Sequence, residues 1–77
     1  MAQNITFPLQ GEYIALNDLL KLAGVTDSGG AGKALVAAGE VTVDGAPESR
    51  KTAKIRAGQV VGVGAGQDSI RIRVVAG

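Results

Sequence analysis

An α+β fold is predicted for this chain, with a pair of short helices followed by a set of β-hairpins. Up to Ala38, apolar residues recur at the three- and four-residue spacing of a helix face, and after Gly39 they alternate with polar residues as in a half-buried strand. The dipeptide Asp44-Gly45, which ends this alternation, favours the tight turn of a β-hairpin. Helices therefore precede most of the strands along the chain.

The chain is expected to begin with a short strand and a first helix. Residues 4–9 form the strand, and Pro8 confines it to a sheet edge or a strand end because proline cannot donate to a ladder. One face of the helix carries apolar residues at i, i+3, i+4 and i+7, namely Leu16, Leu19, Leu20 and Ala23. Asn17 is the predicted N-cap, and Gly24 is predicted to end the helix.

A second helix is predicted shortly after the first. It begins near Thr26, Asp27 or Ser28, since any of these side chains can accept a hydrogen bond from a free N–H of the first turn. Gly39 ends it. The predicted apolar face of this helix consists of Ala31, Ala34, Leu35 and Ala38. Because few residues join the two helices, we expect an αα-hairpin in which the small alanine side chains allow a close approach.

Hairpins are predicted beyond Gly39. Residues 41–43 alternate as a strand and lead into the Asp44-Gly45 turn. Pro47 interrupts the return segment, in which Ile55 is the one obvious core contact. A second turn at Ala57-Gly58 is followed by a strand through Val61 and Val63, a loop over residues 64–69, and a final strand in which Ile70, Ile72 and Val74 alternate with Arg71 and Arg73.

Composition restricts the possible functions. With 77 residues, 45% of them hydrophobic and 19% charged, the chain is expected to form a single domain over residues 1–77. It has no cysteine and no histidine, which removes thiolate metal ligands and the commonest general base. We therefore expect no enzyme, no cofactor and no metal. No apolar run approaches the roughly 18 residues of a membrane helix, and residues 1–7 show neither the basic stretch nor the long apolar run of a secretion signal, so a cytoplasmic location without a membrane is expected.

Positive charge is concentrated in one segment. The net charge is only +1, but four of the eight basic residues, Arg50, Lys51, Lys54 and Arg56, fall within a run of seven positions. A cluster of this kind on a short loop and strand favours binding of regularly spaced anions, such as RNA phosphates, over a pocket for a small molecule. The alternative reading is an ordinary solvated face, which is also the interpretation preferred for Arg71 and Arg73.

Two glycine-rich segments do not satisfy nucleotide-binding motifs. The run from Gly29 to Lys33 lacks the first glycine and the Ser or Thr of a P-loop, and no helix follows the glycines near residue 64. The two aromatic residues, Phe7 and Tyr13, lie outside the basic segment in the sequence. Base stacking is therefore not expected to dominate, and recognition of RNA shape and backbone is favoured.

The order of these elements and the residues at their joints resemble the RNA-binding module named after small-subunit ribosomal protein four, also called the αL RNA-binding motif. The resemblance covers residues 16–63 and is strongest to the small stand-alone, ribosome-associated bacterial members, which share the Leu-Leu-Lys-Leu run at 19–22. It rests on Gly39, Val41, Val43, Asp44, Gly45, Arg50, Lys51, Lys54, Ile55, Gly58 and Gln59. One position departs from the pattern: many members have arginine after the serine that starts the second helix, whereas here Ser28 precedes Gly29.

The resemblance implies two short antiparallel helices packed on a small, mostly antiparallel sheet of three to five strands. It also implies non-catalytic binding of structured RNA across the second helix and the basic segment. The residues expected to contact phosphates are Lys33, Arg50, Lys51, Lys54 and Arg56, supported by Ser28, Gly29 and Gly30 at the start of the second helix. The expected partner is ribosomal RNA, the ribosome or an assembly intermediate, and the expected state is a monomer.

Two other functions stay open on the sequence alone. One is a protein-interaction adaptor, in which the basic segment docks on an acidic partner surface. The other is a detached accessory domain that targets an enzyme in trans.

Overall fold

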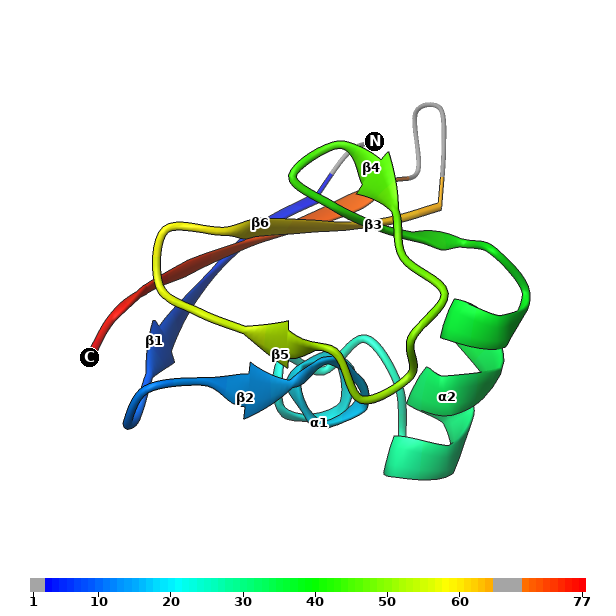
Figure 1. Cartoon of the computed structure of the whole chain (residues 1–77), viewed down its shortest axis with the longest axis horizontal. Coiled ribbons are helices and arrows are strands. Elements are labelled where there is room, and N and C mark those ends of the chain that lie inside the picture. The colour runs from blue at the N-terminus through cyan, green and yellow to red at the C-terminus, as the bar shows by residue number, and fades with distance from the viewer. Residues whose placement is uncertain (1–2, 65–68) are drawn as a thin grey trace.

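The computed structural model describes residues 3–64 and 69–77, and its elements form two layers (Figure 1). One layer is a five-stranded sheet, and the other contains helix α1 and a two-stranded sheet, with helix α2 at one side. In chain order the elements are β1 (Gln3–Leu9), β2 (Ile14–Ala15), α1 (Leu16–Leu22), α2 (Gly29–Ala37), β3 (Val41–Val43), β4 (Ala46–Pro47), β5 (Lys54–Ile55), β6 (Val60–Val63) and β7 (Ile70–Ala76). The predicted α+β class is confirmed.

The large sheet has the strand order β1-β7-β6-β3-β4. Three of its pairings are antiparallel, as predicted, and the fourth, between β1 and β7, is parallel. The first strand therefore lies beside the last one, with Ile5 opposite Ile72 and Phe7 opposite Val74. Because β1 is an edge strand, Pro8 occupies the kind of position that was predicted for it.

The two-stranded sheet was not predicted. It pairs β2 with β5 in antiparallel register, so that Ile14 lies opposite Ile55 and Ala15 opposite Lys54. Ile55 is buried and is the core contact expected in the basic segment. Through this pairing, the residues just before α1 lie next to a basic segment some forty positions later in the chain.

The core lies between the large sheet and α1. Three leucines of α1 that were predicted to form its apolar face, Leu16, Leu19 and Leu20, are completely buried. The remaining buried hydrophobic residues are Leu9, Val36, Val41, Ala53, Ile55, Val61, Val63, Ile72 and Val74. The alternating valines and isoleucines of β3, β6 and β7 therefore face the helix layer, as their period of two predicts.

The predicted N-cap of α1 is wrong. The N-cap is Ala15, which offers no side-chain hydrogen bond, and Asn17 lies inside the helix and is buried. Backbone carbonyls of the basic segment take the place of a capping side chain, because the N–H of Leu16 donates to the carbonyl of Ala53 (2.9 Å) and that of Asn17 to the carbonyl of Lys51 (3.1 Å). The predicted end is correct: Gly24 follows the helix with φ of +83°.

In α2, Ser28 is the N-cap among the three predicted candidates, and its Oγ accepts from the N–H of Ala31 at 3.1 Å. The predicted apolar face is wrong, since Gly32 and Val36 are the buried residues of the helix. Of the four predicted face residues, Leu35 is half-buried and the alanines at 31, 34 and 38 are exposed.

Gly32 explains why the buried face of α2 differs from the predicted one. A Cβ atom on Gly32 would lie only 2.9 Å from the carbonyl oxygen of Asn17, so the backbones of the two helices approach where a side chain is missing. The helices contact one another as expected for an αα-hairpin. In Figure 1, however, α1 is seen nearly end-on while α2 stands in the plane of the picture, so they cross rather than run side by side in antiparallel fashion.

The hairpin at Asp44-Gly45 is confirmed. Both residues have positive φ, 52° and 85°, as a two-residue hairpin turn of the favoured type requires. The return strand β4 is only two residues long and ends at Pro47. The predicted loop over residues 64–69 falls mostly on residues 65–68, outside the described residues. None of the described helices is long and apolar enough to cross a membrane.

Candidate nucleic-acid interface

The basic segment, residues 50–56, is held in place by its main chain. Its carbonyls at Lys51 and Ala53 accept the first two N–H groups of α1, and the N–H of Ala53 closes a turn on the carbonyl of Arg50 at 3.3 Å. Ala53 and Ile55 are buried, whereas Lys54 and Arg56 are exposed. Alternation along the segment thus directs apolar side chains into the core and cations into solvent.

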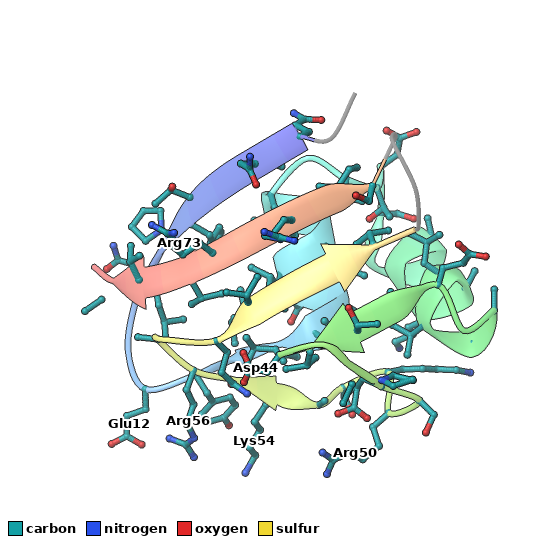
Figure 2. All side chains as sticks on the ribbon, turned by 90° about the horizontal axis from the view of Figure 1, so that it is seen from above. Glu12, Asp44, Arg50, Lys54, Arg56 and Arg73 are labelled. Atoms are coloured by element: carbon teal, nitrogen blue, oxygen red, sulfur yellow. The ribbon has the colours of Figure 1, made fainter. Side chains whose placement is uncertain are left out.

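The cations of this segment share one edge of the molecule. Figure 2 shows Arg50, Lys54 and Arg56 in a row along that edge, with Glu12 beside Arg56 at the end of the row. A cleft between these side chains is lined by Arg50, Lys51, Thr52, Ala53 and Lys54. The structure therefore brings together the four cations that cluster in the sequence.

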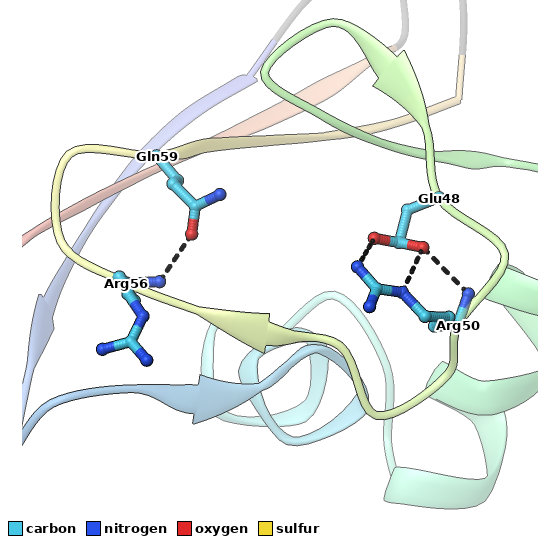
Figure 3. A network of polar contacts seen from close by, with 4 residues as sticks. All are labelled: Glu48, Arg50, Arg56 and Gln59. Carbon is cyan, nitrogen blue, oxygen red and sulfur yellow. Dashed lines mark hydrogen bonds and ion pairs between the residues drawn. The ribbon is translucent and has the colours of Figure 1, made fainter.

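Arg50 is paired with Glu48 (Figure 3). Its Nη2 donates to Oε1 of Glu48 at 3.2 Å, its Nε donates to Oε2 at 3.3 Å, and its backbone N–H donates to Oε2 at 3.0 Å. These side-chain hydrogen bonds from Arg50 lower the pKa of the Glu48 carboxyl and raise the pKa of Arg50. The pair orients the guanidinium group and offsets part of its charge.

The Arg50 side chain stays accessible despite this pair. It is 78% exposed, against 17% for the side chain of Glu48. An anion can therefore approach the exposed part of the guanidinium group, although its Nε and Nη2 already donate to Glu48. Glu48 was not identified from the sequence as a partner of Arg50; their i, i+2 spacing is the signal that could have shown it.

Gln59 fixes the turn that ends the basic segment. Its Oε1 accepts from the backbone N–H of Arg56 at 2.7 Å (Figure 3), and its own N–H donates to the carbonyl of Arg56 at 3.2 Å. Gly58 supplies a φ of +96° between them. Gly58 and Gln59, which contribute to the family resemblance, therefore fix the turn by which the chain leaves β5, and with it the position of Arg56.

Comparison with known proteins shows the family. A family model described as the S4 domain matches residues 7–73. The chain belongs to the S4 domain family. YbcJ of Escherichia coli strain K12, a candidate RNA-binding protein, is 53% identical over 49 residues, which cover 64% of this chain and 70% of YbcJ. An uncharacterized YbcJ of Shigella flexneri matches with the same identity and coverage.

A solved structure gives the same result for the fold. The solution structure of E. coli YbcJ, described as revealing an αL motif involved in RNA-binding, superposes with a TM-score of 0.63 at 46% identity. The match covers 88% of this chain and 85% of YbcJ. The recognition of an αL motif and the predicted fold are therefore confirmed, with a sheet that is mixed because of the parallel β1–β7 pair.

Within this S4 domain, the predicted residues at the start of α2 belong to a different element from the basic segment, and Asn17 contacts both. Lys33 and Gly30 are exposed and Gly29 is half-buried. The Ser28 hydroxyl is already used as a helix cap. These four residues do not line the cleft formed by residues 50–54.

Asn17 provides the link between the two parts of the S4 domain. Its N–H binds the carbonyl of Lys51, and its own carbonyl oxygen lies against Gly32 of α2. One buried backbone unit thus sets the position of α2 relative to the basic segment. The cleft beside α2 is lined instead by Val25, Thr26, Asp27, Ala31, Ala34 and Leu35, and it contains none of the predicted site residues.

Sequence reasoning also missed an aromatic side chain at the site. Tyr13 lies beside the basic segment, with the Lys54 Nζ 5.0 Å and the Arg56 Cζ 5.9 Å from the centre of its ring. No local pattern could have shown this, because it results from the pairing of β2 with β5. Arg71 and Arg73, by contrast, are exposed on the outer strand face, as predicted.

Proposed function

We propose that this S4 domain binds structured RNA without catalysis, through phosphate contacts along the edge formed by the basic segment. The observation that carries the proposal is the row of Arg50, Lys54 and Arg56 on one edge, above a buried and hydrogen-bonded main chain. The similarity to E. coli YbcJ supports the proposal, because the solution structure of that protein is described as revealing an αL motif involved in RNA-binding.

Each group has a defined part in this proposal. Lys51 and Lys54 line the cleft as mobile point charges, and Arg50 presents a pre-oriented guanidinium group to a phosphate. Lys33 and the first-turn N–H groups of Gly29 and Gly30 make supporting contacts, since the N-terminal N–H groups of a helix have no partner inside the helix. The Ser28 hydroxyl holds the helix start instead of binding RNA directly.

We further propose that the RNA is ribosomal or belongs to an assembly intermediate, and that the domain acts in the cytoplasm as a monomer. A net charge of +1 supports a shaped interface over general attraction to polyanions. Crosslinking in cells, followed by sequencing of the bound RNA, tests this: enrichment of ribosomal RNA is expected. Enrichment of messenger RNA without ribosomal RNA would contradict the ribosomal assignment.

Salt dependence of binding tests the assigned edge. A labelled RNA stem-loop is titrated with the protein at a series of salt concentrations, and the association constant is plotted against salt on logarithmic axes. Because each phosphate contact releases about 0.7 to 0.9 counterions, the double variant Arg50→Ala/Lys54→Ala should give a slope that is shallower by about 1 to 2 units.

The matched control is Arg71→Ala/Arg73→Ala, which removes the same charge from the outer face of β7. This variant should keep the wild-type slope. Equal losses in both double variants would mean that net charge alone governs binding, and no loss in either would mean that the edge is wrongly assigned. Capture of a protein partner that persists after nuclease treatment, with no RNA affinity, would favour the adaptor function instead.

A further inference from the structure

Tyr13 is exposed beside two cations of the basic segment. Its side chain is 45% exposed, and Tyr13 and Leu22 are the two large hydrophobic residues exposed in the part of the chain that the structure describes. The Lys54 ammonium lies 5.0 Å and the Arg56 guanidinium carbon 5.9 Å from the ring centre, within the range of cation–π attraction. The ring therefore contacts two cations although it is not part of the core.

The strand register explains why these three side chains share one face. Ile14 lies opposite Ile55 in the β2–β5 pair, and the Ile55 side chain is buried. Side chains alternate across a strand, so Tyr13, Lys54 and Arg56, each one position away from these isoleucines, project to the opposite, solvent side. The group is thus a product of the same pairing that anchors the basic segment.

We propose that Tyr13, Lys54 and Arg56 form a site for a single unpaired nucleotide, whose base stacks on the tyrosine ring and whose phosphate binds the two cations. This inference rests on the proposed RNA-binding function and adds to it, because phosphate contacts alone require no aromatic ring. A nucleotide combines a flat π surface with an anion, and the site combines an exposed ring with two cations. The proposal therefore specifies a bulged or looped base in the bound RNA, next to the phosphates at Arg50 and Lys51.

Two short RNAs that differ by one base test the site. One is a blunt, fully paired duplex, and the other is the same duplex with a single bulged adenosine. Binding is measured by anisotropy for the wild type, Tyr13→Leu and Tyr13→Phe. Leucine keeps an apolar side chain but removes the π surface, whereas phenylalanine keeps the ring.

The wild type is expected to bind the bulged duplex more tightly than the paired one by roughly 5-fold or more, the range of one stacked base. Tyr13→Leu should lose this preference, and Tyr13→Phe should keep it. The chain contains one tyrosine and no tryptophan, so its intrinsic emission reports on Tyr13 alone. That emission should be quenched by the bulged duplex and much less by the paired duplex.

The outcomes separate the two proposals. If both duplexes bind equally, with steep salt dependence and no effect of Tyr13→Leu, the nucleotide site is wrong while RNA binding stands. If Tyr13→Leu still prefers the bulged duplex, the base does not stack on this ring, and the site is equally wrong. If neither duplex nor the stem-loop binds, the proposed function fails, and the nucleotide site fails with it.

Discussion

Replacing Gly32 by alanine should destabilise the protein, although alanine is the better helix former. A Cβ atom at this position would lie 2.9 Å from the carbonyl oxygen and 3.3 Å from the Cα of Asn17, against 3.4–4 Å for an ordinary contact. Both of these atoms belong to the main chain, so α1 and α2 must move apart. Overpacking of this kind costs about 1–3 kcal/mol, which the roughly 1 kcal/mol gained from alanine's helix propensity offsets only in part.

Gly30→Ala is the matched control in the same helix. A Cβ atom on Gly30 would meet only the Ser28 Oγ, at 3.9 Å, so this variant carries the propensity change without the clash. The two variants should differ by about 1–3 kcal/mol in free energy of unfolding, with Gly32→Ala the less stable.

Urea unfolding followed by far-UV circular dichroism measures this difference. With a slope of about 1 kcal/mol per molar urea for a small domain, the two midpoints should lie about 1 M or more apart. A Gly32→Ala protein that unfolds at the same urea concentration as Gly30→Ala, or at a higher one, would refute the close contact between Gly32 and Asn17. The placement of α2 relative to the basic segment would then need another explanation.

Two further predictions concern single polar contacts. The pKa of Glu48 is lowered in the folded protein by its hydrogen bonds from Arg50, so the pair stabilises the fold above the usual carboxyl range and loses this effect as the pH falls through the lowered pKa. Wild type should therefore be slightly more stable than Glu48→Gln at neutral pH, with a gap in urea midpoint that closes in acid; a gap that widens in acid would contradict the pairing. Ser28→Ala should cost about 0.5–2 kcal/mol by uncapping the N–H of Ala31, whereas Ser28→Asp should restore most of it, and an unchanged urea midpoint for Ser28→Ala would show that the cap contributes nothing.

Local chemistry made several features predictable from the sequence. The Asp44-Gly45 turn, the stop at Gly24 and a side-chain cap among residues 26–28 each depend on the local preferences of a few residues, although the structure was needed to select Ser28. The buried leucines of α1 and the valines of β3 and β6 follow from periods of 3.6 and 2, which are properties of single elements. The cluster of four cations is likewise visible as a run of residues.

Predictions failed where a residue's environment comes from a distant segment. Asn17 was assigned as a cap because its own neighbours suggest one, but carbonyls at Lys51 and Ala53 bind the first N–H groups of α1. The apolar face of α2 was assigned from its alanines, but a missing side chain at Gly32 allowed the closest approach to α1.

The sequence by itself determined the two helices, the Asp44-Gly45 turn and the strands of the large sheet that follow Gly39, and that positive charge follows the central hairpin, because these depend on neighbours along the chain. Only the tertiary structure decided that β2 pairs with β5, and hence that Tyr13 lies beside Lys54 and Arg56. This pairing is selected because Ile55 is buried in the core and the partly buried Ile14 packs against it, and that burial depends on the whole packed arrangement.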